Sequence, residues 1–305
     1  MRRGRGIGII IAAMGVTLER RTGRWTFALI LVGLAGVGAA ALAYLTSPIR
    51  SSEAPAATAA PTDPVAANRI HVPMFVDPAL VRPTPRFRFT FDPPEVLAPL
   101  RLEEGLDAIV GDAPSDLQRC AALMRWARAQ WEPGIPNPYP PLDARIILRD
   151  IRRGFTGGFC AQYNYVLAQA LQSFGIPARY VSLIEHEVIE ARLPDAGRWV
   201  CLDPLYDAWY ADDAGTPLSV HEIHTRLKRS QEVTPSPGHR IKDLKAHWSA
   251  FASFAVWLKN DHVSAPVNFT DLERYKVHFL DEPAGASGLA PGALATAEPA
   301  DLYPG

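Results

Sequence analysis

Two hydrophobic periodicities follow one another along residues 86–281 and predict a domain that mixes helices with strands. Apolar residues recur at the spacing of one helix face in five segments: 100–111, 115–131, 160–174, 217–232 and 241–260. Apolar and polar residues alternate, as in half-buried strands, in four segments: 86–91, 178–184, 186–193 and 198–204. The last three strands are consecutive, and a turn at 195–197 joins the final pair, so they are expected to run antiparallel. The pattern predicts an α+β fold with helices packed on an antiparallel sheet.

Serines mark the expected start of two of these helices. Ser115 stands at the N-cap position of the helix over 115–131. Ser219 and Glu222 have the spacing of a capping box, in which each residue satisfies a backbone N–H of the first turn.

The segments outside these elements are rich in small and cyclic residues. Prolines are too dense in 132–144 for regular structure, so a surface loop is predicted there. The Ala- and Pro-rich segment 46–85 has no helix or strand period and is typical of an extended linker. Residues 282–305 are small, polar and proline-rich, which predicts a disordered tail.

An uncharged apolar segment at residues 25–45 is long enough to cross a bilayer, which takes about 20 residues. Six arginines and one glutamate precede it, whereas residues 46–69 contain only two arginines, offset by two acidic residues. The positive-inside rule therefore puts residues 1–24 in the cytoplasm and the remainder outside. A signal peptide cleaved after Ala43 is the alternative, because residues 41–43 read Ala-Leu-Ala, but the apolar run exceeds the usual length of such a signal. Both interpretations export the domain at 86–281, and the uncleaved anchor is favoured.

Composition excludes several other classes of protein. A net charge of −1 gives no electrostatic basis for nucleic-acid binding. Three cysteines are too few for a disulfide scaffold and too scattered for a zinc ribbon. The odd number leaves at least one thiol without an intramolecular partner, and Cys160 is the natural candidate.

Cys160 is expected in the first turn of the helix over 160–174, directly after two glycines and Phe159. Unpaired backbone N–H groups and the helix dipole at such a position favour a thiolate over a thiol. A buried cysteine after glycines is more often a core residue than a nucleophile. The catalytic interpretation therefore depends on a base elsewhere in the sequence.

His186 is the histidine, among eight, that opens a strand directly after the strand leaving the cysteine helix. An antiparallel pair that closes at 194–198 sets residue 186 opposite 205 or 206, so Asp203 lies within about one residue pair of it. A helix-borne thiol, a histidine on one strand and a carboxylate on the next form a nucleophile–base–orienter arrangement. The candidate catalytic residues are Cys160, His186 and Asp203, with no metal or cofactor expected.

Three motifs lie in this region: Gly158-x-Cys160, the run Gly-Ile-Pro-Ala-Arg at 175–179, and the paired strands with His186, Glu190, Gly197, Trp199, Asp203 and Pro204. Together they resemble the transglutaminase-like cysteine enzymes of the papain-type fold. The resemblance covers about residues 115–210. It implies a papain-like core, with Cys160 as the nucleophile, His186 as the general base and acid, and Asp203 as the orienter.

The resemblance implies an enzyme that transfers acyl groups from a peptide or carboxamide bond through a thioester. Because the segment 25–45 is expected to export the domain, peptides or proteins of the cell envelope are the expected partners. Glu187-Val188 stand where the family often has Ala-Trp, and Ala161-Gln162 stand where acidic residues are common. These departures favour hydrolysis over protein cross-linking. A catalytically silent binding or assembly module is one alternative. The start Gly-Gly-x-Cys-x-x-x-Asn also resembles arylamine N-acetyltransferases, but an exported domain would not meet acetyl-coenzyme A.

Other candidate groups have simpler interpretations. Cys201 with His186 supplies two ligands, short of the three or four that zinc needs. Cys120 and Cys201 are expected to be buried, although export permits a disulfide between them. His221 and His224 lie one turn apart, most simply on a solvated helix face. Trp126 and Trp131 are expected in the core, with donation to an oxyanion as the alternative. Glu190 is expected either to line the cleft or to pair with Arg192 and its neighbours.

Overall fold

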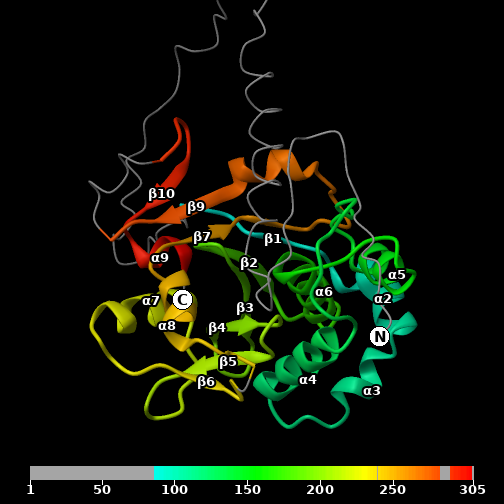
Figure 1. Ribbon diagram of the computed structural model, residues 1–305, viewed down its shortest axis with the longest axis horizontal. Helices are drawn as coiled ribbons and strands as arrows, with labels where there is room; N and C mark the ends of the chain where they lie inside the picture. The colour runs from blue at the N-terminus through cyan, green and yellow to red at the C-terminus, as the bar shows by residue number, and fades with distance from the viewer. Residues whose placement is uncertain (1–85, 239, 282–288, 304–305) are drawn as a thin grey trace, which may run out of the picture. The chain divides into compact units, whose positions relative to one another are not determined.

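The computed structural model describes residues 86–238, 240–281 and 289–303, which are coloured in Figure 1. In these residues an eight-stranded sheet has the order β10-β9-β7-β2-β3-β4-β5-β6, and every neighbouring pair is antiparallel except β10 with β9. The strands are β2 Ala178–Leu183, β3 Glu187–Leu193, β4 Arg198–Asp203, β5 Ala208–Ala211, β6 Thr234–Ser236, β7 Phe254–Trp257, β9 Lys276–Phe279 and β10 Leu294–Thr296. A separate parallel pair joins β1 Thr90–Phe91 to β8 Lys259–Asn260.

Helices cover both faces of the sheet (Figure 1). The helices are α2 Pro94–Glu103, α3 Leu106–Val110, α4 Asp116–Arg128, α5 Ala144–Arg152, α6 Cys160–Gln172, α7 Val220–Lys228, α8 Leu244–Ala250, α9 Pro299–Leu302 and the 3₁₀ helix η3 Phe269–Tyr275. Alternate strand residues point to opposite faces, so Ile189 packs with α4, α5 and α6 whereas Val188 packs with α7 and the residues beside α8. The result is a sheet between two helical layers, as the α+β pattern predicted.

Helix α6 is the buried centre of one layer. Every residue from Ala161 to Gln172 is buried, and the helix packs against α4, α5, β2 and β3. This explains why its apolar positions outnumber those of a single helix stripe. The predicted helix over 160–174 is confirmed within two residues.

Several other predicted elements are also confirmed. Strands β2, β3 and β4 match their predicted segments within a residue at most ends. The hydroxyl of Ser115 accepts the Gln118 N–H at the start of α4, and Ser219 with Glu222 forms the capping box of α7. The segment 86–91 contains only the two-residue strand β1, and the helix expected over 100–111 is divided by Gly105, whose φ of 61° is left-handed.

The predicted loop over 132–144 is confirmed up to Asp143, whereas one predicted helix is wrong. The loop over 132–144 ends at Asp143, whose carboxylate accepts the N–H groups of Arg145 and Ile146 and starts the unpredicted helix α5. The helix expected over 241–260 stops at Ala250, and Phe254–Trp257 instead form β7 between β2 and β9. All four residues of β7 are buried, so both faces of the strand are apolar and the alternation that identifies a strand is lost.

The C-terminal segment also differs from its prediction. Residues 289–303 of the expected disordered tail contain β10, which pairs with β9, and α9, whose Leu302 is fully buried. Tertiary contacts to the sheet order this segment, although its composition alone is typical of disorder. The predicted N-terminus 1–24, anchor 25–45 and linker 46–85 lie outside the described residues, and within the described residues no helix is long and apolar enough to cross a membrane.

Candidate active site

Cys160 is the first residue of α6, as predicted, and its side chain is partly accessible. The Phe159 N–H donates to the side-chain oxygen of Gln162 at 3.1 Å, which fixes the chain where it enters the helix. Backbone N–H groups of the first helical turn have no partner within the helix. The Cys160 thiol therefore lies beside a set of donors that can stabilise negative charge.

The chain before Cys160 passes through a narrow space that only glycine fits. A Cβ at Gly157 would lie 2.5 Å from the backbone oxygen of Ile135, and one at Gly158 would lie 2.8 Å from the indole nitrogen of Trp131. The Gly158 carbonyl accepts two hydrogen bonds, from Gly134 N–H at 2.8 Å and from Trp131 Nε1 at 3.1 Å. These contacts hold the 132–143 loop against the segment that leads into α6.

Trp131 is therefore a structural residue of this loop. Its indole N–H is used by Gly158, and its ring stacks on Tyr163 with centroids 4.1 Å apart. The alternative in which Trp131 donates to an oxyanion is not supported. Trp126 is buried in the core beside α6, as expected.

His186 and Asp203 are brought together by the β3–β4 hairpin. Leu193 pairs with Arg198 and Ile189 with Leu202, and continuing this register sets residue 186 opposite 205, as predicted. His186 Nε2 lies 2.7 Å from Asp203 Oδ2, and the Asp203 side chain is completely buried. Because Nε2 is engaged, Nδ1 is the ring nitrogen left for the Cys160 thiol, which also interacts with the ring.

The surroundings of His186 favour its protonated form. Burial by itself would lower its pKa, but the charge and hydrogen bond of Asp203, together with the contact with Cys160, raise the pKa from 6.5 to about 10. The pKa of His186 is higher in the folded state than in the unfolded state, so folding favours the protonated ring. This contribution to stability is fully present below about pH 6.5. This contribution is lost as the pH rises through about 10.

Two tyrosines that the sequence analysis did not identify border the site. Tyr139, from the proline-rich loop, has its ring centroid 4.8 Å from that of Phe269, and burial followed by the charge of Glu187 raises its pKa. The Tyr206 ring meets the His186 ring edge-on at 5.6 Å, and burial followed by the charge of Asp203 raises its pKa. Both tyrosines also interact with Cys160, and both hydroxyls keep their protons at neutral pH. They lie in segments without any period that a sequence pattern could reveal.

The neighbouring acidic residues have other partners. Glu187 accepts a hydrogen bond from the Tyr180 hydroxyl, and burial raises its pKa. Glu190 is fully buried and pairs with Arg179 instead of lining a cleft.

No cluster of three or more potential metal ligands occurs among the residues that the structure describes. Cys120 and Cys201 are both free and buried on opposite faces of the sheet, so the alternative disulfide is not formed. His224 is not on a solvated face: it is 3% exposed and contacts the Phe251 carbonyl and Asp281.

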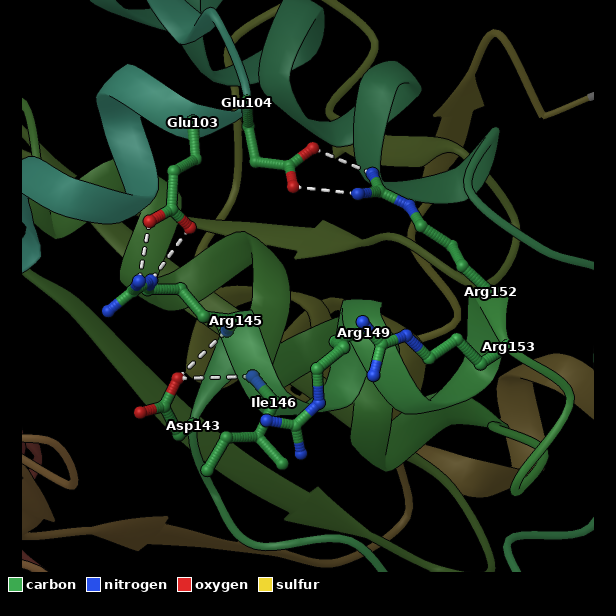
Figure 2. A pocket seen from close by; sticks show the side chains of 8 residues that line it. All are labelled: Glu103, Glu104, Asp143, Arg145, Ile146, Arg149, Arg152 and Arg153. Carbon is green, nitrogen blue, oxygen red and sulfur yellow. Dashed lines mark hydrogen bonds and ion pairs between the residues drawn. The ribbon is translucent and has the colours of Figure 1, made fainter.

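A surface pocket between α2 and α5 does not include the candidate residues (Figure 2). Its charged side chains mostly pair with one another, as in the contacts of Arg145 with Glu103 and of Arg152 with Glu104. We interpret it as a solvated ion-pair network.

Comparison with known proteins identifies the region that carries the candidate residues. Residues 105–204 match the family model of the transglutaminase-like superfamily. No curated protein and no solved structure matches the chain. The matched segment runs from α3 through the end of β4 and contains Cys160, His186 and Asp203. Residues 105–204 of this chain form a transglutaminase-like core domain.

Proposed function

We propose that the domain is a cysteine enzyme that transfers acyl groups from peptide or carboxamide bonds, with Cys160 as nucleophile, His186 as acid and base, and Asp203 as orienter. The observation that carries the proposal is the 2.7 Å contact between His186 Nε2 and a fully buried Asp203 carboxylate, on a ring that also interacts with the Cys160 thiol. A carboxylate so placed holds the imidazole in one orientation and stabilises its protonated form.

The first half of the reaction breaks the amide. The Cys160 thiolate attacks the carbonyl carbon, and the resulting oxyanion is stabilised by the unpaired N–H groups at the start of α6. The His186 imidazolium then donates its proton to the leaving nitrogen, the C–N bond breaks, and the amine departs. The acyl group remains on sulfur as a thioester.

The second half restores the enzyme. Neutral His186 takes a proton from a water molecule, whose oxygen attacks the thioester carbonyl, and the Cys160 thiolate leaves as the carboxylic acid product forms. We place water ahead of an amine as the acceptor, because Ala161-Gln162 and Glu187-Val188 depart from the family pattern.

The side chains near the site favour a peptide substrate with apolar residues. Phe159 precedes Cys160 directly, Ile184 lies two residues before His186, and the Ile135 backbone contacts Gly157. These three are among the large hydrophobic residues that remain exposed, at 39%, 47% and 84% respectively. Exposed apolar groups around reactive residues are typical of substrate-binding surfaces.

Alkylation of the full-length chain with iodoacetamide tests this proposal without knowledge of the substrate. We expect Cys160 to react at pH 6.5 about tenfold faster than the same cysteine in the denatured chain, because only a thiolate reacts. His186→Ala should remove most of this advantage. Cys120 and Cys201 serve as internal references, since burial raises the pKa of both thiols. Equally slow labelling of all three cysteines would contradict catalysis and favour the silent binding module.

We further propose that residues 25–45 anchor the chain with the domain on the outer side of the membrane, where envelope peptides and proteins are accessible. The proposal is supported by the uncharged apolar run and the arginine excess before it.

An alkaline phosphatase fused after Pro85 should be active in cells and remain in the membrane fraction after a carbonate wash, because that enzyme folds only in an oxidising compartment. An inactive fusion would indicate the opposite orientation, with the domain in the cytoplasm, and would make the acetyltransferase alternative possible again. Release of an active fusion into the soluble fraction would instead indicate cleavage after Ala43.

A further inference from the structure

A second pair of buried polar residues lies behind Asp203, outside the segment that matches the family model. The Tyr210 hydroxyl on β5 donates to Asp203 Oδ2 at 3.1 Å, on the same oxygen that contacts His186. The same hydroxyl lies 2.8 Å from Nε2 of His247 on α8. Tyr210 is fully buried and His247 is 7% exposed, so water does not compete readily for these contacts.

The contacts determine which atom carries each proton. A tyrosine hydroxyl has one hydrogen, and an ionised carboxylate can only accept. If Tyr210 gave its hydrogen to His247, the Tyr210 oxygen and the Asp203 carboxylate oxygen would face each other as two acceptors with no hydrogen between them, which is unfavourable. Tyr210 therefore donates to Asp203, and His247 must donate from Nε2 to the Tyr210 oxygen. This arrangement specifies the neutral Nε2–H tautomer or the charged ring of His247.

The other groups around this chain of contacts are consistent with a neutral His247. Burial lowers its pKa most, and the charge of His186, whose ring centroid is 6.1 Å away, lowers it further, while Asp203 opposes the shift. Apart from His186, Tyr210 and His247 themselves, the titratable groups that face these three residues come from four parts of the chain: Cys160 on α6, Glu187 on β3, Cys201 and Asp203 on β4, and Tyr206 after β4. Because burial raises the pKa of Tyr210 well above 10, its hydroxyl remains a donor.

We infer that Tyr210 and His247 are positioning residues that extend the site from Cys160, His186 and Asp203 to a hydrogen-bond network of five residues. In this network His247 donates to Tyr210, and Tyr210 donates to Asp203. The inference rests on the proposed function. The Tyr206 N–H also donates to the other oxygen of Asp203, Oδ1, at 3.3 Å. The Tyr210 hydroxyl adds a donor on the oxygen that contacts His186, where it helps to orient the carboxylate and shares its negative charge. His186 therefore keeps the correct orientation but binds its proton less tightly than it would without the Tyr210 hydroxyl.

Removing the Tyr210 hydroxyl should change this balance. In Tyr210→Phe the Asp203 oxygen that contacts His186 loses one of its donors, so the pH at which the imidazolium loses its proton should rise by about 0.5–1 unit, the size expected for one hydrogen bond. An imidazolium that holds its proton more tightly donates it less readily to the leaving amine. Turnover should therefore fall, by about tenfold, with KM little changed.

The test uses full-length chains labelled with ¹⁵N-histidine. Nuclear magnetic resonance reports the tautomer of His247 and the pH at which His186 titrates, with each signal assigned by single variants. Tyr210→Phe and His247→Leu should both raise the titration point of His186. His247→Gln retains an N–H donor and should restore the wild-type value. The control is His224→Leu, which removes another buried histidine next to Phe251 but has no contact with Asp203.

Two results would overturn the inference. One is an Nδ1–H tautomer of His247, because that ring cannot donate to Tyr210 from Nε2. The other is a His186 titration point that is unchanged in Tyr210→Phe, a variant that loses a single oxygen atom and is expected to fold. If Cys160 of the wild-type chain is alkylated rapidly but either of these two results is obtained, the inference fails and the proposed function stands. If wild-type Cys160 does not react rapidly, the proposed function fails and this inference with it.

Discussion

Replacing Cys160 with alanine is expected to abolish turnover, with a loss of about 10⁴-fold or more, while the fold remains intact. The loss is large because no other group in the proposed mechanism can form the thioester. The fold should tolerate the change because the side chain is partly exposed at the first position of α6 and alanine is a good helix former. The activity is measured on peptides selected from a library of amides by the full-length chain, and stability by denaturant unfolding.

Two matched variants sharpen this prediction. Cys160→Ser keeps the shape of the site but replaces the thiol by a hydroxyl, and should be almost as inactive as Cys160→Ala. Cys120→Ala removes a fully buried thiol from the core beside α6, so it should lower stability and leave activity largely unchanged. Normal turnover by Cys160→Ala would exclude the proposed mechanism.

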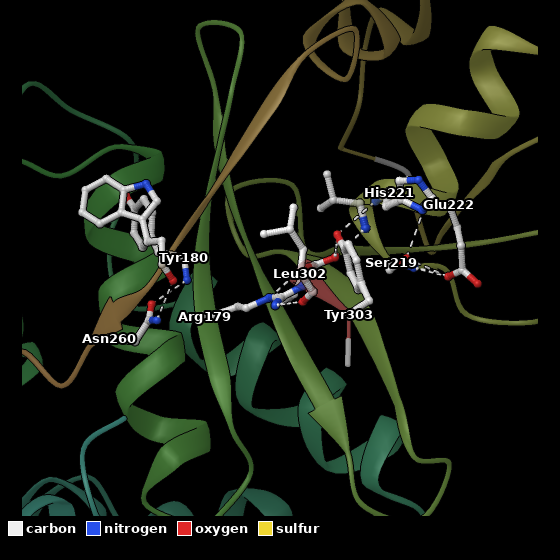
Figure 3. A network of polar contacts seen from close by, with 11 residues as sticks. Arg179, Tyr180, Ser219, His221, Glu222, Asn260, Leu302 and Tyr303 are labelled. Carbon is white, nitrogen blue, oxygen red and sulfur yellow. Dashed lines mark hydrogen bonds and ion pairs between the residues drawn. The ribbon is translucent and has the colours of Figure 1, made fainter. Parts of the chain in front are cut away.

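The largest effect on stability is expected at the buried pair of Arg179 and Glu190. Figure 3 shows Arg179 beside Leu302 and Tyr303 of the C-terminal segment. Both side chains are completely buried, with Arg179 Nη2 2.6 Å from Glu190 Oε2. The guanidinium also donates to the Leu302 carbonyl at 2.5 Å and lies 3.9 Å from the Trp199 ring centroid. The other carboxylate oxygen accepts from the Val220 N–H and the Tyr303 hydroxyl at 2.7 and 2.9 Å. Through these contacts the pair joins strands β2 and β3 to the start of α7 and to the C-terminal segment.

Arg179→Leu or Glu190→Leu should each lower the free energy of unfolding by about 3–5 kcal/mol, because either change leaves a buried charge unpaired. The double variant should be less destabilised than the sum of the single variants, since it leaves no isolated charge. Chemical denaturation of the full-length chain measures these differences.

The exposed pair of Arg226 and Asp213 supplies the control for this experiment. Its carboxylate is 73% accessible, so Asp213→Ala should cost less than about 1 kcal/mol. Equal small effects at both pairs would show that Arg179 and Glu190 do not hold the C-terminal segment to the sheet.

Elements with a clear period could be predicted from the sequence, and elements buried on both faces could not. The strands β2–β4 alternate, and helix α6 has apolar residues at helical spacing, so local pattern identified both. In β7 the run Phe-Ala-Val-Trp is apolar throughout because both faces are covered, and it could not be distinguished from a continuing helix. Within residues 289–303, Leu302 and Tyr303 contact Arg179 and Glu190, which are more than 100 positions earlier in the chain, so no local pattern indicates these contacts.

The same distinction applies to the site. Hairpin register alone places His186 near Asp203, because a tight turn determines which residues of two strands face each other. Tyr210 reaches Asp203 from β5, and His247 reaches Tyr210 from α8; no spacing rule relates α8 to the hairpin. Tyr139 comes from a proline-rich loop whose path depends on Gly134 and Trp131 contacting Gly158. Such contacts become visible only in three dimensions.

Intact-mass measurement after acid quenching tests the central claim, a thioester on Cys160, most directly. The full-length chain, mixed briefly with a peptide that it cleaves, should gain the mass of the acyl half of that peptide. Fragmentation should place the added mass on Cys160, neutral hydroxylamine should remove it, and Cys160→Ala should show none. Cleavage that proceeds with no adduct on wild-type Cys160, together with undiminished cleavage by Cys160→Ala, would contradict the account.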